Sequence, residues 1–297
     1  MSALPRATLR DTGGGEIDAD ATQAEWIAQR AFDALLGELA AWPKPGLVSH
    51  VDSGSHTDMD APLLEASAAA LHPYFAELGR AGQNDAPMDH LRTIGLHAEA
   101  AMLAATGGVN THRGAIFGLG LLSAAAGYGL AGGHARSALN LGTIVARRWG
   151  DRIRRGPIPI FSHGAAALRR YGAGGARAEA AAGFPSVYEI GLPALRQGRR
   201  LRPEDPHAAA VQACFALIAV VEDTNLLHRG GLEGARYASA AAASFLAEGG
   251  VGTETWRSRA AGIHADFVSR RLSPGGCADL LAMTLFVDIL EDGQSPS

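Results

Sequence analysis

The chain has 297 residues, of which 47% are hydrophobic and 19% are charged. This length and composition suit one large globular domain or two small ones, with enough apolar residues for a sizeable core. The formal net charge of −4 provides no general basic field, which argues against nucleic acid as a partner but leaves room for a local pocket that binds a small anion.

The first residues, 1–20, are predicted to form a flexible tail, since they contain Gly13-Gly14-Gly15 and lack the apolar segment of a signal peptide. The apolar stretches at 211–221 and 280–290 are shorter than the roughly 20 residues that cross a bilayer, so no membrane span is predicted. Cys214 and Cys277 stand alone in apolar surroundings, which is typical of buried thiols in a reducing compartment. We therefore expect a cytoplasmic protein with a single domain over 21–292.

Helical periodicity dominates the chain after the tail. Apolar residues recur at spacings of three and four, and alternating β-branched runs are nearly absent. This pattern predicts an all-α fold, a compact bundle of about ten or more helices. The predicted helices span about 21–41, 62–81, 88–106, 111–130, 135–150, 161–171, 186–198, 206–221, 232–247, 253–270 and 275–291. Pro73 lies inside the second of these and predicts a kink, and the small residues at 122–127 favour close packing of helices.

A long polar connection runs from Pro43 to Asp60 between the first two helices. Loops of this length are usually functional or disordered, and the mixed composition favours function. Lys44, on a turn stiffened by prolines, is a candidate point charge for phosphate, although a solvated lysine at a helix end is the alternative. Asp58 and Asp60 lie two residues apart and could hold Mg²⁺ or supply a base. Asp60 alternatively only caps the next helix, because it precedes Ala61-Pro62.

The first polar motif is Gly108-Val-Asn-Thr-His-Arg-Gly114. We expect a helix to begin at Asn110 or Thr111, and the free N–H groups of a helix start bind phosphate. His112 and Arg113 then place positive charge in the first turn, which is unfavourable for the helix dipole and indicates an anionic ligand. The alternative is an ordinary N-cap followed by an exposed His-Arg pair.

The second polar motif is Glu222-Asp-Thr-Asn-Leu-Leu-His-Arg-Gly-Gly231. Acidic residues directly after an apolar helix have the wrong sign for its C-terminus, and a bound cation would correct this. Asn225 and His228 share one face if Thr224 starts a new turn, which the two glycines then end. Alternatively, Asp223 caps a short helix that exposes His228 and Arg229.

Two glycine-rich segments are weaker candidates. Arg177 and Glu179 follow a glycine-rich turn that lacks the P-loop pattern, and a flexible surface turn is an equally good interpretation. Ser273-Pro274 fits a helix start, and the following Gly275 and Gly276 could let a nucleotide approach the backbone.

Taken together, these segments resemble the triphosphoribosyl-dephospho-CoA synthase family. The matching pieces, which span about residues 24 to 290, are Pro43-Lys-Pro-Gly-Leu-Val48, Gly54-Ser-His-Thr-Asp-Met-Asp60, Gly108–Gly114, Gly174-Gly-Ala-Arg177-Ala-Glu179, Gly183-Phe-Pro-Ser186, Glu222–Gly231, and Ser273-Pro-Gly-Gly276 with Asp279-Leu-Leu. The chain has Ala178 and Cys277 where many members of the family carry Gly and Ser, and neither change removes a charged group. The Ala- and Arg-rich chain looks more like the malonate decarboxylase branch than the citrate lyase branch.

The resemblance implies an all-α enzyme that transfers the triphosphoribosyl group of ATP to 3′-dephospho-CoA and releases adenine. The product, 2′-(5″-triphosphoribosyl)-3′-dephospho-CoA, is the precursor of the prosthetic group on an acyl carrier subunit, to which a downstream prosthetic-group transferase delivers it. With Mg²⁺ as cofactor, the candidate catalytic residues are Asp58, His112, Glu222, Asp223 and His228, and Asp58, Glu222 and Asp223 are the candidate metal ligands. The candidate nucleotide-binding residues are Lys44, Gly46, Ser55, His56, Asn110, Thr111, Arg113, Gly114, Arg177, Glu179, Asn225, Arg229, Gly275 and Gly276.

These roles fit the chemistry of an N-glycosidic bond. Its cleavage passes through an oxocarbenium-like state that a carboxylate stabilises, while proton transfer serves the acceptor hydroxyl and the leaving base. Two alternatives stay open: a Mg²⁺-dependent all-α N-glycohydrolase that gives the ribosyl group to water, and a non-catalytic nucleotide-binding module. The sequence also leaves the oligomeric state open and allows a homodimer.

Overall fold

The structure is a computed structural model that describes residues 19–133, 140–156 and 175–292. Within these residues the chain is helical and contains no β-strand. The α-helices are α1 (Ala19–Ala40), α2 (Ala61–Gln83), α3 (Met88–Ala105), α4 (Arg113–Ala131), α5 (Leu141–Arg155), α7 (Gly175–Ala181), α8 (Leu192–Leu201), α9 (Pro206–Val220), α10 (Thr224–Ala247), α11 (Trp256–Ser269) and α12 (Gly275–Asp292), with a π-helical turn η2 (Ser186–Gly191) and a 3₁₀ turn η3 (Gly250–Gly252). The predicted all-α class is confirmed.

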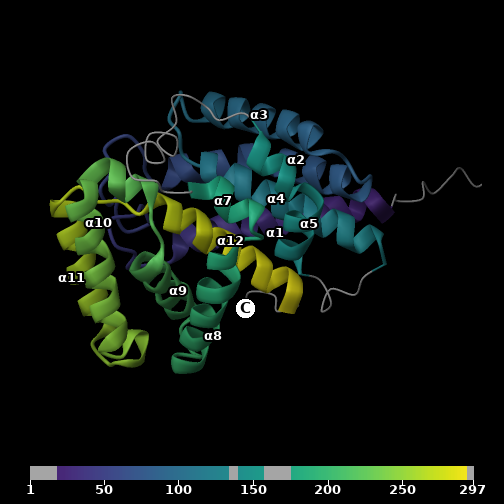
Figure 1. Ribbon diagram of the computed structural model, residues 1–297. Helices are drawn as coiled ribbons and strands as arrows, with labels where there is room; N and C mark the ends of the chain where they lie inside the picture. The colour runs from purple at the N-terminus through teal and green to yellow at the C-terminus, as the bar shows by residue number, and fades with distance from the viewer. Residues whose placement is uncertain (1–18, 134–139, 157–174, 293–297) are drawn as a thin grey trace, which may run out of the picture.

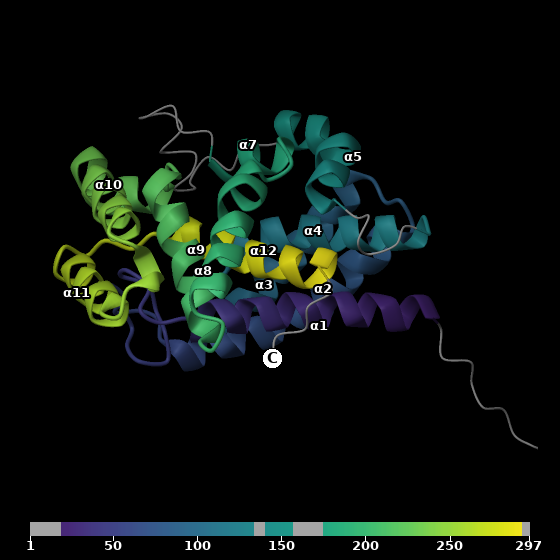
Figure 2. The same cartoon turned by 90° about the horizontal axis from the view of Figure 1, so that it is seen from below.

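Helix α12 runs through the middle of the molecule and packs on α1, α4 and α9 (Figure 1). Helix α2 lies between α1 and α4, and α3 covers α2. The view from below places α10 and α11 at one end of the molecule, with α8 and α9 beside them and α5 and α7 further along (Figure 2). This arrangement brings the N-terminal ends of α10 and α12 to the same region, next to the start of α4.

Several helices begin where the sequence offers a cap. Asp60 accepts a hydrogen bond from the Leu63 N–H (3.0 Å), so the interpretation of Asp60 as the N-cap of α2 is the one that the structure shows. Asn140 caps α5 by accepting from the Thr143 N–H (2.7 Å), which sets the start of this helix at Leu141 rather than at the predicted 135. Pro73 lies inside α2, which continues past it to Gln83.

Other segments differ from the predicted elements. The single helix expected at 186–198 is a π-helical turn followed by α8. Here the Leu192 N–H donates to the Val187 carbonyl five residues back, and the following Pro193 has no N–H to donate. Arg177 and Glu179, predicted to lie beside a glycine-rich turn, belong to the short helix α7. The predicted helix at 161–171 and nearly all of the predicted tail lie outside the described residues.

The predicted close packing of small residues occurs between α2 and α4. A Cβ atom added to Gly82 would lie 1.9 Å from the Ala124 carbonyl oxygen, and one added to Gly127 would lie 2.0 Å from the Gly79 oxygen. The backbones of the two helices therefore approach closely only because glycine occupies these positions.

We expect Gly82→Ala to lower the free energy of unfolding by about 1–3 kcal/mol, because the added methyl group forces α2 and α4 apart. Gly95→Ala is the matched control, since a Cβ at Gly95 of α3 meets no atom within 4 Å, and it should raise stability by about 0.5–1 kcal/mol. Urea denaturation of both variants measures the difference. Equal stabilities would contradict the close approach.

Helix α4 forms part of the core. It is long and apolar enough to cross a membrane, yet 72% of that stretch is buried inside the protein. Helices α9 and α10 are long and apolar enough to cross a membrane only when they are taken together, and they are bent by 59° relative to each other. A buried core helix has the same length and composition as a membrane span, so these helices are weak evidence for one.

Candidate active site

The loop that follows α1 is pinned from its first residues by an interior ion pair. The Lys44 side chain is 0% exposed, and its Nζ donates to the Glu38 carboxylate and to the Glu38 backbone carbonyl. The Lys44 carbonyl in turn is hydrogen-bonded by Nδ1 of His264 (2.7 Å), a residue of α11. Lys44, predicted to bind phosphate, therefore lies in the interior and neutralises a carboxylate.

The next part of the loop rests on the segment that precedes α12. Gly46 has a φ of +68°, and a Cβ there would lie 2.1 Å from the Leu272 carbonyl oxygen. Ser55 donates its N–H to the Gly46 carbonyl (3.0 Å) and its hydroxyl to the Leu272 carbonyl (2.6 Å). Gly46 and Ser55, both predicted to bind nucleotide, thus shape the loop.

Three predicted site residues meet at the edge of this loop. The Arg229 guanidinium donates to Nδ1 of His56 (3.2 Å) and to the Ser55 carbonyl (3.0 Å), and the Asp58 carboxylate lies 3.5 Å from the same His56 nitrogen. Nε2 of His56 is hydrogen-bonded to the Ser273 hydroxyl (2.8 Å). Burial lowers the pKa of His56, and the charge of Arg229 lowers it further. The exposed Arg229 and Asp58 are therefore held at a fixed place on the surface.

His112 is the N-cap residue of α4 and is buried, with 7% of its surface exposed. Its Nδ1 is hydrogen-bonded to the Ser67 hydroxyl (2.7 Å), and its backbone N–H donates to Sδ of Met102 (3.2 Å). Burial, followed by the nearby charge of Lys44, lowers the pKa of His112 to about 4. The imidazole is therefore neutral near pH 7, and the alternative of an exposed His-Arg pair does not hold for His112.

The low pKa of His112 implies that the stability of the protein depends on pH. Because the folded-state pKa is below the ordinary 6.5, the unfolded chain binds the proton first as the pH falls. The wild type should therefore lose about 3 kcal/mol of unfolding free energy relative to His112→Gln as the pH falls from about 6.5 to about 4. Denaturation curves of both proteins across this range measure it, and curves that run parallel would contradict the low pKa.

The remaining residues of the first motif complete the start of α4. Asn110 accepts a hydrogen bond from the Arg113 N–H (3.3 Å), and the half-exposed Arg113 guanidinium is paired with Glu99 of α3. The expected excess of positive charge in this first turn is thus absent, because Glu99 balances Arg113 and His112 is neutral. The turn keeps its dipole, while Asn110 takes the Arg113 N–H.

Asp223 lies in the interior and joins two helix starts. As the N-cap of α10 it accepts from the N–H groups of Asn225 (2.7 Å) and Leu226 (3.1 Å) with Oδ1. Its Oδ2 accepts from the Cys277 N–H (2.8 Å) in the first turn of α12. Burial raises the pKa of Asp223, while these N–H donors act against the rise.

This placement corrects the sign argument made from the sequence. Helix α9 ends at Val220, and the extended Val221 separates it from the next helix. Asp223 therefore stands at an N-terminus, where a negative charge is favourable, rather than at a C-terminus. Helix α10 begins at Thr224, ahead of the helix predicted at 232–247, and Gly231 interrupts it with a φ of 60°.

Asp279 is the functional candidate that sequence reasoning missed, although it lies in the quoted Ser273–Asp279 segment. It is half-buried on the second turn of α12 and accepts a hydrogen bond from the Ala115 N–H of α4. A Cβ on Gly114 would lie 1.9 Å from its Oδ2. Burial raises the pKa of Asp279 well above its ordinary value, and the Asp223 and Glu38 carboxylates raise it further.

The starts of α4, α10 and α12 therefore converge around two carboxylates. Asp223 ties α10 to α12, and Asp279 ties α12 to α4. The buried Lys44, Glu38 and Cys214 belong to the same interior cluster, since the charges of Lys44, Glu38 and Asp223 all act on the Cys214 thiol. Cys214 and Cys277 are free and buried, as predicted. No sequence motif surrounds Glu38, so sequence analysis could not have identified this residue.

Other predicted residues lie around this centre or apart from it. Thr111 is hydrogen-bonded to Ser67 (2.7 Å), and a Cβ on Gly275 or Gly276 would crowd Asn225 or Asp223, respectively. Glu222 and His228 are exposed. Arg177 donates to three carbonyls at the end of α5, those of Ile153, Arg154 and Gly156. Glu179 accepts from the Ser186 N–H (2.7 Å), so both of these side chains hold backbone together.

No group of three or more His, Cys, Asp or Glu side chains within the described residues is arranged to hold a metal ion. Asp58 and Glu222 are exposed, whereas both oxygens of Asp223 accept backbone N–H groups. The donors present thus do not fit a metal held by the protein alone, but they fit Mg²⁺ that arrives on a polyphosphate and needs only one or two carboxylates.

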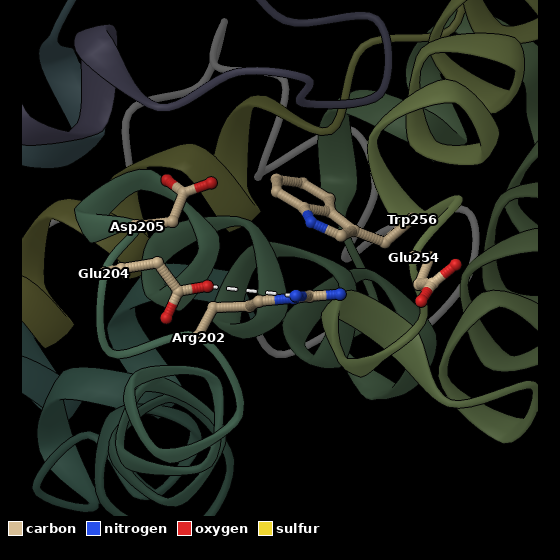
Figure 3. A pocket seen from close by; sticks show the side chains of 5 residues that line it. All are labelled: Arg202, Glu204, Asp205, Glu254 and Trp256. Carbon is tan, nitrogen blue, oxygen red and sulfur yellow. Dashed lines mark ion pairs between the residues drawn. The ribbon is translucent and has the colours of Figure 1, made fainter.

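Two surface hollows lie away from the helix convergence. One, of about 410 Å³, is lined by Arg202, Glu204, Asp205, Glu254 and Trp256 (Figure 3). The Arg202 guanidinium there already donates to the carbonyls of residues 251–253. The other, of about 630 Å³, is lined by Thr22, Glu25, Trp26, Gln29, Arg30 and Arg80. Neither hollow contains a residue predicted from the sequence.

Comparison with known proteins identifies the family. The model of the CitG family, described as ATP:dephospho-CoA triphosphoribosyl transferase, matches residues 24–297. The chain belongs to this family. Proteins named probable 2-(5″-triphosphoribosyl)-3′-dephosphocoenzyme-A synthase are 43% identical in Stutzerimonas stutzeri and 42% identical in Azotobacter vinelandii. The first match covers 92% of this chain and 94% of the relative, and the second covers 90% and 92%.

The resemblance to the triphosphoribosyl transferase family stated from the motifs is thereby confirmed. The match takes in both polar motifs, the loop after α1 and the start of α12. No solved structure matches the chain. The convergence of helix starts therefore has to be interpreted from its own geometry.

Proposed function

We propose that the protein transfers the triphosphoribosyl group of ATP to the 2′-hydroxyl of 3′-dephospho-CoA and releases adenine. The observation that carries this proposal is the convergence of the α4, α10 and α12 starts on Asp223 and Asp279, beside a neutral His112. Helix starts favour a polyanion, and a carboxylate favours the positive charge that develops at C1 of the ribose. Family membership and the names of the relatives support the same reaction.

The triphosphate would lie against the three helix starts. Arg113 and Arg229 carry exposed guanidinium groups near two of them, and guanidinium binds phosphate oxygens through paired donors. Mg²⁺ would enter with ATP, keep part of its water shell and take one or two carboxylates in addition to phosphate. Asp58 and Glu222 are exposed, and we assign this contact to them.

We assign the carboxylate that faces C1 to Asp279. Asp223 already accepts three backbone N–H groups, whereas Asp279 accepts one and keeps part of its surface exposed. As the C1–N9 bond of ATP breaks, its electron pair goes to adenine, which takes up a proton from water as it leaves. The acceptor oxygen forms the new bond to C1, and its proton goes to Nε2 of His112, which is neutral and free to accept it.

The product is the precursor of the prosthetic group on the acyl carrier subunit of malonate decarboxylase, with citrate lyase as the alternative pathway. A downstream prosthetic-group transferase is then the next partner. We place the reaction in the cytoplasm, because the two buried thiols are free and such thiols suit a reducing compartment.

The experiment is to incubate the protein with ATP, Mg²⁺ and dephospho-CoA and to follow free adenine by chromatography and the nucleotide product by mass. We expect adenine and a product whose mass equals that of dephospho-CoA plus ATP minus adenine. Omission of dephospho-CoA is the control, and adenine release without the acceptor would indicate a glycohydrolase instead. A folded protein that releases no adenine under either condition would overturn the proposal.

A further inference from the structure

Two hydroxyl groups lie in line with the buried imidazole of His112. The Ser67 hydroxyl, in the second turn of α2, lies 2.7 Å from Nδ1 of His112 and 2.7 Å from Oγ1 of Thr111. Ser67 is 0% exposed, whereas Thr111 is half-buried. The three side chains therefore form a short row of hydrogen bonds that leads from the interior toward the surface.

Ser67 makes the one side-chain hydrogen bond of the His112 ring among the described residues. The other hydrogen bond of this residue, to Met102, uses the backbone N–H. The charged group that acts on the ring is Lys44, whose Nζ is held by Glu38. One hydroxyl, that of Ser67, thus sets the orientation of the His112 ring. It also sets which of the two ring nitrogens carries the proton of the neutral imidazole.

The row can run in two directions, and the proposed role of Nε2 as a base requires one of them. A serine hydroxyl has one proton to donate. If Ser67 donates to Thr111, it accepts from Nδ1–H of His112, and Nε2 keeps its lone pair. This arrangement persists when Nε2 takes up a proton, because Nδ1–H still donates to Ser67. If Ser67 instead donated to Nδ1, Nε2 would carry the proton from the start and could not act as a base.

We infer that Ser67 is a positioning residue for the proposed reaction, holding His112 in the tautomer whose Nε2 accepts the proton of the acceptor hydroxyl. Thr111 completes the row by accepting from Ser67. The inference rests on the proposed function, and it concerns a residue that neither polar motif contains.

The test is a double-mutant cycle on steady-state adenine release. We expect Ser67→Ala to lower kcat by about 10- to 100-fold, with the KM values for ATP and dephospho-CoA changed by less than about threefold because substrate contacts are kept. In a His112→Gln background, Ser67→Ala should have no further effect on kcat, because Ser67 acts only through the imidazole. Ser67→Thr, which keeps the hydroxyl, should retain activity within about fivefold of the wild type.

Ser123→Ala is the matched control. Ser123 is also a buried serine at the packed core of α2 and α4, but its hydroxyl has no hydrogen-bond partner, so its loss should leave kcat within about twofold. Circular dichroism establishes that each variant is folded. If Ser67→Ala does not fold, Thr111→Val in the wild-type and His112→Gln backgrounds provides the same cycle.

Three outcomes would overturn the inference: an unchanged kcat in Ser67→Ala, an equal loss in the His112→Gln background, or a loss that appears only in KM. These outcomes differ from a failure of the proposed function. In that case the wild-type protein itself would release no adenine with dephospho-CoA.

Discussion

Asp279→Asn is expected to lower kcat for adenine release by about 10³-fold, which corresponds to about 4 kcal/mol of transition-state stabilisation. The change keeps the size of the side chain and removes a carboxyl group whose ionised form is disfavoured by burial in the free protein and would be stabilised by the positive charge that develops at C1. The affinity for ATP should fall much less, since the helix starts and the guanidinium groups that would hold the triphosphate are unchanged. Single-turnover measurement of adenine release, together with ATP binding by calorimetry, separates the two effects.

Asp288→Asn is the matched control for this prediction. Asp288 is a buried aspartate on the same helix, and it is paired with Arg199 (2.7 Å) rather than directed at another helix start. Its variant should lose some stability but keep kcat within about threefold. Gly114→Ala should resemble Asp279→Asn, because its methyl group would occupy the place of Oδ2 of Asp279. If extra Mg²⁺ restored the activity of Asp279→Asn, Asp279 would be a metal ligand and the assignment to C1 would be wrong.

The all-α fold could be predicted because its signals are local. Periodic apolar residues define the helices, and short polar side chains such as Asp60 and Asn140 set where two of them start. The π-helical turn at Ser186–Gly191 was missed. It depends on a hydrogen bond shifted by one residue before a proline, which leaves the apolar pattern unchanged.

The site was only partly predictable, because its contacts cross the chain. His112 and Asp223 stood out from the sequence as polar residues beside helix starts, and both lie at the convergence. Asp279 acquires its importance from Gly114 and Ala115, on a helix that lies far from it in sequence. No spacing rule reveals such a partner. The charge pattern also misled at the boundary between α9 and α10. The acid pair Glu222-Asp223 belongs to the start of the following helix and not to the end of the preceding one.

Lys44 shows the same limit most clearly, and it supports the second large prediction. The proline-flanked turn indicated a phosphate contact, yet the side chain is fully buried against Glu38. We expect Lys44→Met to lower the free energy of unfolding by about 3–5 kcal/mol, because it leaves the Glu38 carboxylate buried without a partner. This is a large part of the total stability of an ordinary domain, so the melting temperature should fall steeply.

Arg148→Met is the matched control for Lys44→Met, since Arg148 forms an ion pair with Asp85 at the surface. Such pairs contribute at most about 1 kcal/mol. The double variant Lys44→Met with Glu38→Gln should recover part of the lost stability, because it removes the unpaired charge. Thermal unfolding and ATP binding together decide the role of Lys44. A lysine that binds the substrate contributes little to the stability of the fold when no substrate is bound. A Lys44→Met protein with wild-type stability and weakened ATP binding would therefore support the phosphate contact and contradict the interior ion pair.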